Sequence, residues 1–447
     1  MTNHAATPAT DARGSQFVAE AARQVMRRCD QLADCTDRPG EVCRLFCSPA
    51  MQSAHTLVRS WIEATGMSCR LDAAGNLIGR LDPPKAGDHR AVQNEQAAAL
   101  IIGSHLDTVV NGGKYDGALG VLLGLALAEI AVKTDTALPF PLVVIGFCEE
   151  EGVRYQEPYF GSRALVGDIP DAWLRRPDAE GVPLADALRT FRGDPDRLAE
   201  CVLRPEDVLA LVEPHIEQGP TLEDRSLPLG VVTGAVGHSR ASLEFVGRAG
   251  HAGTVPMQSR RDALCAAAQF IVELEQLAAG VAGLVATVGR VEVLPNVANV
   301  IPGEVRLRLD LRHAEDRDRL AAFRKAIERA GEIARQRGLE FNLLWEQQQE
   351  SVQFDAACSG RLEQAIVAAG LTPGRLSSGA GHDAVILARH FPTAMLFLRC
   401  AGGISHHPDE AVSEADVATA LEVLWRFVTD LAASTAPDGV QVARTKI

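Results

Sequence analysis

The chain has 447 residues, of which 47% are hydrophobic and 23% charged, the composition of a protein that buries a core. Its 44 Lys and Arg against 58 Asp and Glu give a formal net charge of −14, which argues against nucleic acid as the main partner. The longest apolar run, Ala118–Ala128, ends at Glu129 and is too short to span a membrane, which takes about 20 residues.

The two ends of the chain, residues 1–13 and 433–447, are small and polar, so the sequence predicts irregular tails. The N-terminal tail has no apolar stretch, and we therefore expect no secretory signal there. The ten cysteines are scattered without a CxxC pair, which is typical of reduced thiols. We expect a cytoplasmic protein.

The first part of the chain alternates between helical and strand patterns. Apolar residues at helical spacing predict helices over Ser48–Gly66 and Gly117–Lys133. Short apolar segments predict strands over Met67–Leu71, Asn76–Leu81, Ala97–Gly103 and Pro141–Cys148. Strand, helix and strand at this spacing indicate parallel strands with helices on the faces of the sheet.

A different pattern begins near Pro228. The sequence predicts strands over Ser239–Gly247, Gly283–Val293, Glu304–Arg312 and Leu339–Trp345. It predicts helices over Ser259–Ala279, after the first strand, and over Glu315–Gly338, after the third. This β-α-β-β-α-β order is the ferredoxin-like arrangement. After Val352 the earlier alternation returns, with a helix near Gly360–Gly370, a strand over Thr393–Arg399 and a helix over Glu414–Ala432.

These patterns together predict an α/β fold with two domains. Residues 14–227 and 347–434 would form one three-layer domain around a mixed sheet. Residues 228–346 would form a smaller ferredoxin-like α+β domain inserted into it.

Groups that can bind metal or transfer protons follow the predicted strands. His105 and Asp107 come directly after Ala97–Gly103, and residues two apart in an extended chain point to the same side. Glu149–Glu151 follow the next strand of this region. Three adjacent carboxylates at the end of a buried strand repel one another, and a divalent cation would offset that cost.

Two later segments add histidines. His215 lies in EPHIEQGP, and His406 and His407 follow the strand TAMLFLRC. Taken alone, each of these groups is more often part of a surface turn or a solvated face. Their shared position at strand ends favours a metal site, and mixed nitrogen and oxygen ligands suit zinc or manganese.

The chain resembles the dinuclear-metal M20-type amidohydrolases. The resemblance is carried by seven motifs in order, GSHLDTVVNGGKYDGALGV, EEEGVRY, HIEQGP, GHAGTVPM, NVIPGEV, SGAGHDA and GISHHPDE. Within that family the chain is most similar to the hydantoinase/carbamoylase branch, which holds N-carbamoyl-L-amino acid hydrolases, β-ureidopropionases and allantoate amidohydrolases. The similarity runs over residues 16–432.

The resemblance implies two divalent metal ions per subunit, zinc or manganese. Their ligands would be His105, Asp116, Glu151, His215 and His406. Asp116 would bridge both ions, Glu150 would be the general base, and Asp107 would orient His105. Peptidase members usually carry a carboxylate at the position of His215, so the histidine favours the branch that hydrolyses ureido groups.

The resemblance also implies substrate contacts from the inserted domain. Arg312 would bind a carboxylate of the substrate, Asn299 and Gln218 would form hydrogen bonds to it, and His251 would approach the oxyanion of the tetrahedral intermediate. In this family that histidine comes from the inserted domain of the neighbouring subunit. A homodimer through this domain, which would also close over the substrate as a lid, is therefore implied.

The expected substrate is a small molecule that carries a ureido group near a carboxylate. The joint pattern of GHAGTVPM, SGAGHDA and RCAGGISHHP is most similar to allantoate amidohydrolases, whose reaction would release ammonia and carbon dioxide. Hydrolysis of N-carbamoyl-L-amino acids or of N-carbamoyl-β-alanine is the alternative. A dipeptidase, an aminopeptidase and a metal-free binding protein are remoter alternatives. Three histidines keep no assigned role, His238, His382 and His407.

Overall fold

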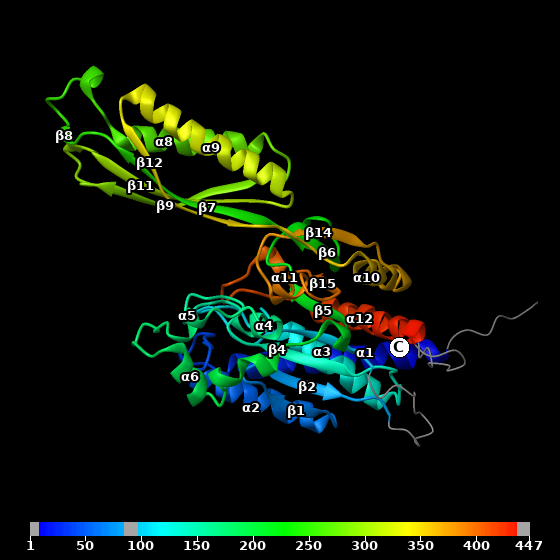
Figure 1. Cartoon of the computed structure of the whole chain (residues 1–447). Coiled ribbons are helices and arrows are strands. Elements are labelled where there is room, and N and C mark those ends of the chain that lie inside the picture. The colour runs from blue at the N-terminus through cyan, green and yellow to red at the C-terminus, as the bar shows by residue number, and fades with distance from the viewer. Residues whose placement is uncertain (1–8, 85–96, 436–447) are drawn as a thin grey trace, which may run out of the picture. The chain divides into compact units, whose positions relative to one another are not determined.

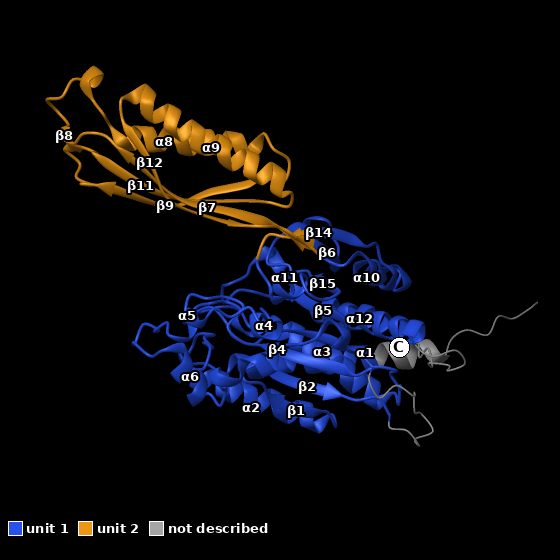
Figure 2. Ribbon diagram, viewed as in Figure 1, with its two compact units in different colours: residues 1–233, 354–376, 381–447 blue, residues 234–353, 377–380 orange. Residues whose placement is uncertain are grey.

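The computed structural model describes residues 9–84 and 97–435 (Figure 1). The chain divides into two compact units (Figure 2). Unit 1 comprises residues 1–233, 354–376 and 381–447, and unit 2 comprises residues 234–353 and 377–380. In the described part of the chain, none of the helices combines the length and the apolar character needed to cross a membrane.

The predicted irregular tails are partly helical. Helix α1 (Ala9–Ala33) begins inside the expected N-terminal tail, and α12 (Glu414–Thr435) continues beyond Ala432. The rest of both tails, residues 1–8 and 436–447, lies outside the described residues. The segment of α1 folds as a helix because its buried residues recur at helical spacing. These residues are Val18, Ala22, Val25, Cys29 and Leu32.

The described residues form a nine-stranded mixed sheet, most of which lies in unit 1, and this confirms the predicted mixed α/β class. The strand order is β1-β2-β4-β3-β5-β15-β6-β13, and β14 pairs with β6. The central strands β4, β3, β5 and β15 are parallel, and the pairs β1–β2, β2–β4, β15–β6 and β6–β13 are antiparallel. The strands are β1 (Ser68–Leu71), β2 (Leu77–Leu81), β3 (Ala99–His105), β4 (Leu142–Phe147), β5 (Val208–Ile216), β6 (Leu229–Ala235), β13 (Val352–Gln353), β14 (Gly374–Ser378) and β15 (Thr393–Leu398).

Helices cover both faces of this sheet. The central strands are mostly apolar because both of their faces are buried, so Leu100 and Ile102 join one core cluster and Ile101 joins the other. The first cluster includes residues of α1, α2 (Pro49–Ala64), α3 (Ala118–Lys133), α10 (Ala356–Ala368) and α12. The second includes residues of α4 (Phe160–Val166), α6 (Leu184–Thr190) and α11 (Asp383–Leu387).

Unit 2 is a four-stranded antiparallel sheet in the order β12-β7-β11-β9. Its elements in chain order are β7 (Gly237–Val246), α8 (Ala263–Ala279), β9 (Val285–Leu294), β11 (Glu304–His313), α9 (Asp316–Arg337) and β12 (Glu340–Gln349). Along β11, Val305, Leu307, Leu309 and Leu311 are buried while Arg306 and its even-numbered neighbours are more exposed. One face of the sheet therefore packs against α8 and α9 (Figure 1).

The limits of the two units differ from those expected from the sequence. They fall at 233/234 and 353/354 instead of 227/228 and 346/347. The reason is β6, which pairs with β15 from Leu229 to Val232 and so belongs to the large sheet. The short segment 377–380 also joins unit 2.

Candidate metal centre

The parallel strands of unit 1 end at one edge of the sheet, and the candidate ligands follow these ends. His105 is the last residue of β3, and His215 lies one residue before the end of β5. Glu149–Glu151 follow β4, and His406 follows β15. Because the carboxyl ends of parallel strands meet at the same edge, groups that are far apart in the sequence converge there.

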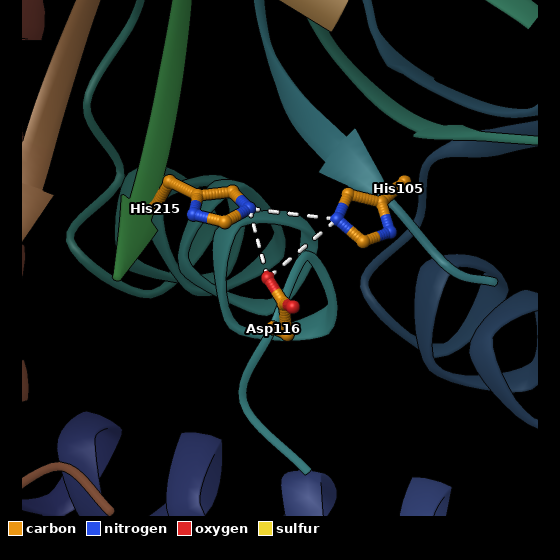
Figure 3. A group of neighbouring side chains, drawn as sticks. All are labelled: His105, Asp116 and His215. Carbon is orange, nitrogen blue, oxygen red and sulfur yellow. Dashed lines mark hydrogen bonds and ion pairs between the residues drawn. The ribbon is translucent and has the colours of Figure 1, made fainter. Parts of the chain in front are cut away.

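One group of converging side chains is formed by His105, Asp116 and His215 (Figure 3). Both imidazoles point toward the Asp116 carboxylate, which lies just before α3. The distance from Asp116 Oδ1 to Nε2 is 3.2 Å for His215 and 3.8 Å for His105. The two Nε2 atoms are 3.4 Å apart. All three residues are buried, so these nitrogen and oxygen atoms share a site with little access to water.

A second group uses the other oxygen of Asp116. His406 Nε2 lies 3.2 Å from Asp116 Oδ2 and 3.4 Å from Glu151 Oε1. The ligand atoms of Asp116, Glu151 and His406 lie within 4.8 Å of one another. The Asp116 carboxylate therefore faces both groups, one with each oxygen, which is the position expected for a bridging ligand.

The loop that carries Asp116 depends on a glycine. Gly117 has a φ of +63°, which side chains other than glycine rarely adopt. A Cβ atom at this position would lie 2.4 Å from the His105 ring. Glycine therefore lets the backbone pass close to the imidazole and brings Asp116 in front of it.

Backbone carbonyls orient both histidines of the first group. His105 Nδ1 lies 3.0 Å from the carbonyl oxygen of Asp107, and His215 Nδ1 lies 2.9 Å from that of Ile216. A proton on Nδ1 leaves Nε2 free as a metal ligand. Asp107 is the residue that we expected to orient His105, and its carbonyl is the closer partner, because its Oδ1 lies 3.8 Å from Nδ1.

The Asp107 carboxylate holds the segment after β4. Its Oδ1 accepts the backbone N–H of Glu150 at 3.1 Å and its Oδ2 accepts that of Glu151 at 3.0 Å. Glu149 accepts the backbone N–H of Tyr155 instead. Of the three carboxylates, Glu150 and Glu151 therefore join the cluster with His105, and Glu149 stabilises the following loop.

Burial and charge shift the protonation of these groups. Burial raises the pKa of Glu151 to about 7, and burial together with the Glu151 carboxylate raises the pKa of Glu150. Burial opposes ionisation of Asp116 too, but hydrogen bonds from His215 and His406 hold its pKa well below the usual value. The hydrogen bond to Asp116 raises the pKa of His406 to about 9. The cluster thus stabilises positive charge among buried carboxylates, and its donor set fits a divalent cation.

Gln218 is the remaining predicted residue that lies at this cluster. Its Nε2 is 3.2 Å from Asp116 Oδ2 and 3.3 Å from His406 Nε2, and its backbone adopts a φ of +58°. The amide can therefore form hydrogen bonds beside the candidate metal ligands. This position is compatible with the expected contact to a substrate.

The other predicted substrate residues lie in unit 2. His251 is in β8 (Gly250–His251), which pairs with β10 (Val300–Ile301), and the next residue donates its N–H to the Asn299 carbonyl at 2.9 Å. Arg312 lies near the other end of β11. Its guanidinium donates to Asp310 at 2.7 Å and to the Gly379 carbonyl at 2.6 Å. The structure places His251 and Asn299 together and Arg312 apart from them.

The three histidines without assigned roles lie in different surroundings. His382 packs edge-on against His215, with ring centroids 4.5 Å apart. His238 lies within β7, not before it as expected, and burial lowers its pKa to about 4. His407 is exposed and lies 3.6 Å from Asp409.

Two buried carboxylates for which the sequence predicted no role support the cluster. Glu213, in β5, accepts hydrogen bonds from Ser104 Oγ at 2.8 Å and from the backbone N–H of Ala384 at 2.7 Å. Glu410 accepts backbone N–H groups beside Asp116. Both residues lie within quoted motifs, but only the folded chain shows which atoms they contact.

The mixed sheet carries a cluster of histidines and carboxylates at the ends of its parallel strands, and Glu150 lies beside the proposed ligands. This combination is typical of metal-dependent hydrolases. The chain belongs to the Peptidase family M20/M25/M40, which matches residues 101–430. It is 38% identical to an N-carbamoyl-L-amino acid amidohydrolase from Geobacillus stearothermophilus, over 92% of this chain and 98% of the relative. It is 36% identical to a probable allantoate deiminase from Oryza sativa subsp. japonica, over 93% and 91%.

A solved structure also places the chain among these amidohydrolases. The chain superimposes on an amidase of the hydantoinase/carbamoylase family from Burkholderia multivorans with a TM-score of 0.84 and 31% identity, over 92% of this chain and 98% of that one. These comparisons confirm the predicted resemblance to the hydantoinase/carbamoylase branch of the M20-type enzymes. The chain is accordingly a hydrolase that acts on C–N bonds of linear amides.

Proposed function

We propose that this protein hydrolyses the ureido C–N bond of a small carboxylate, with allantoate as the first candidate substrate. The observation that carries the proposal is the convergence of His105, Asp116 and His215 in one buried group, with Glu150 beside it. Ammonia, carbon dioxide and an amine would be the products. The names of relatives at 36% identity include allantoate deiminases, which supports this choice.

Two divalent cations would be held by the two groups that share Asp116, the first with His105 and His215 and the second with Glu151 and His406. When bound, such ions polarise a carbonyl oxygen and make water a stronger acid at neutral pH. The donor set accepts zinc and manganese alike.

Glu150 is placed to move the proton in this reaction. It is buried beside Glu151, and both effects raise its pKa, so its carboxylate is a stronger proton acceptor than a solvated glutamate. Glu150 would accept a proton from the attacking water and return it to the leaving nitrogen when the C–N bond breaks. The backbone of Glu150, held by Asp107, keeps the carboxylate oriented during both transfers.

Substrate recognition would come from unit 2, a ferredoxin-like inserted domain in our proposal. Arg312 would bind the substrate carboxylate with its planar guanidinium, in competition with Asp310, which it contacts in this structure. His251 would stabilise the oxyanion, and Asn299 and Gln218 would form hydrogen bonds to the substrate. Closure of unit 2 would exclude water.

The geometry of unit 2 supports a homodimer. His251 pairs with Val300, four residues before β11 begins at Glu304, and Arg312 lies eight residues beyond that start of the strand. At a rise of about 3.4 Å per residue these two points on the strand are about 27 Å apart. A small ureido carboxylate is shorter than this span, so one copy of unit 2 cannot place both side chains on it. We therefore propose that His251 and Asn299 act in the site of the partner subunit.

The test is ammonia release by metal-stripped protein after zinc or manganese is supplied. We expect turnover of allantoate with added metal and none without it. Turnover of N-carbamoyl-L-amino acids at the greater kcat/KM would favour the second candidate function, which the 38% identity to such an enzyme supports. Turnover of a dipeptide panel but of neither ureido substrate would refute the proposal.

A cytoplasmic location of the protein stays a prediction.

A further inference from the structure

Glu410 is a buried carboxylate in contact with both loops that carry ligands of the second metal group. It is the last residue of the motif GISHHPDE and is 3% exposed. Its Oε1 accepts the backbone N–H of Tyr115 at 2.9 Å and that of Asp116 at 3.0 Å. Its Oε2 accepts the hydroxyl of Ser405 at 3.1 Å. One carboxylate therefore joins Asp116 to the residue next to His406, across 294 positions of the chain.

Each oxygen of Glu410 accepts at least one hydrogen bond, and Glu410 is not in any of the groups of described residues that could hold a metal ion. Its carboxylate instead satisfies two backbone donors that solvent cannot reach. Loss of such an acceptor leaves buried N–H groups unpaired, and the loop then relaxes toward water or toward other acceptors. The loop holds the backbone of Asp116, whose side chain faces the histidines of both groups. Movement of this backbone would move the bridging carboxylate.

A glycine makes room for this contact. A Cβ atom on Gly113 would lie 2.1 Å from the carboxyl carbon of Glu410 and 2.2 Å from Oε1. Any side chain at this position would push Glu410 away from Tyr115 and Asp116. The second glycine of NGGKYD is therefore explained by the close approach of the carboxylate.

We propose that Glu410 is a positioning residue that fixes Asp116 and the His406 loop for metal binding. The proposal rests on the metal site of the proposed function. Glu410 acts through hydrogen bonds to the backbone, so its contribution should depend on the acceptor oxygen and not on the charge. Removal of a partner behind a metal ligand typically weakens metal binding about 10- to 100-fold.

The experiment measures the dissociation constants of Mn²⁺ and Zn²⁺ for metal-stripped full-length protein, by competition with a chelator, together with its melting temperature. Glu410→Ala should weaken binding of the metal about 10- to 100-fold. Glu410→Gln should restore affinity to near the wild-type value, because the amide oxygen still accepts from Tyr115 and Asp116 and the NH₂ group can donate to Ser405. Equal affinities of Glu410→Ala and the wild type, or equally weak binding by both variants, would overturn the proposal.

A control separates positioning from general stability. Asp355 accepts the backbone N–H of Cys358 at 2.7 Å at the start of α10, so Asp355→Ala should lower the melting temperature without changing metal affinity. Equal losses of affinity in Asp355→Ala and Glu410→Ala would show a merely structural role and refute the proposal.

A second variant covers the case in which Glu410→Ala fails to fold. Gly113→Ala displaces the carboxylate from the other side and should also weaken metal binding. Gly360→Ala is its control, because a Cβ atom there meets nothing within 4 Å. Unchanged affinity in Gly113→Ala would count against Glu410. If the wild type itself binds neither Mn²⁺ nor Zn²⁺, the proposed function fails together with the role of Glu410. If the wild type binds metal and the variants bind it equally well, only the role of Glu410 fails.

Discussion

The Asp107 carboxylate accepts the backbone N–H of Glu150 at 3.1 Å, which ties the end of β3 to the end of β4 across 43 positions. Its other oxygen accepts the N–H of Glu151. The same residue orients His105 through its backbone carbonyl. A histidine of the first group, the proposed base and a ligand of the second group thus depend on one aspartate.

Asp107→Asn should disturb Glu150 and Glu151, whose backbone N–H groups the carboxylate accepts, while the backbone carbonyl that contacts His105 is unchanged. The amide accepts with one oxygen only, and its NH₂ group would face a backbone N–H of Glu150 or Glu151. We expect metal affinity to fall about 10- to 100-fold and kcat to fall with it. Metal competition and steady-state kinetics measure both. A variant with normal metal affinity and normal kcat would show that the carboxylate has no positioning role.

Glu150→Gln should separate metal binding from proton transfer. Glutamine has the size of glutamate but cannot accept a proton, so kcat should fall about 10²- to 10⁴-fold. Metal content should stay near that of the wild type, because the ligands are unchanged. Kinetics with metal analysis of the same sample provides the measurement. Near-normal kcat would exclude Glu150 as the base.

His406→Ala should remove one of two metal ions. His406 contacts Asp116 and Glu151 but neither His105 nor His215, so the first group keeps its ligands. We expect bound metal to fall from about two ions per chain to about one. Elemental analysis after dialysis measures the ratio. A wild-type ratio of about one would refute the two-metal proposal.

Mixing two inactive variants should restore activity if the sites are shared between subunits. In a hybrid of Arg312→Leu and His251→Ala, one site has a normal arginine and a partner with a normal histidine. Random exchange would make about half of the dimers hybrid with one intact site each, so about a quarter of the wild-type activity should return. If both residues act within their own subunit, every site stays defective and mixing restores nothing.

The stability of the metal-stripped protein should fall in mild acid because of His55. This histidine is buried against Phe191, and burial lowers its pKa to about 3, below the value near 6.5 in an unfolded chain. The unfolded state therefore binds the proton first, so stability from the neutral ring is complete above pH 6.5 and is lost as the pH falls. At pH 5.5 the loss is about 1.4 kcal/mol.

His55→Leu should remove this acid-sensitive contribution. Its free energy of unfolding, measured with urea, should decline less between pH 7 and 5.5 than that of the wild type. An exposed histidine, His390, provides the control, and His390→Leu should follow the wild-type curve. Identical curves for all three proteins would contradict the assignment to His55.

Much of the fold could be predicted because local patterns are strong in the central strands. β4 is apolar along its whole length and β3 is apolar up to Gly103, and the predicted ranges agree with the observed ones to within two residues. β5 was missed because Glu213 and His215 interrupt its apolar run, although both are buried in the fold. Helix α1 was missed because the polar start of the chain hid its helical spacing.

The candidate site could be predicted in part. The residues that converge on Asp116 all stood in the quoted motifs, and the donor types alone indicated a metal. The sequence named Asp107 as the partner of His105 but not the atom, and in the structure the carbonyl of Asp107 is closer to the imidazole than its carboxylate. Such a choice depends on backbone angles after β3, which spacing in the sequence does not contain.

The sequence by itself determined which donors the protein has and the alternation of elements that places them after strands. Only the tertiary structure decided that Glu410 meets Tyr115 and Asp116, because 294 positions separate the acceptor from the second of these donors. Contacts of this kind follow from sheet order and loop geometry. They are favourable because a buried N–H group without an acceptor would raise the free energy of the folded state. No local sequence pattern predicts which acceptor such a group will find.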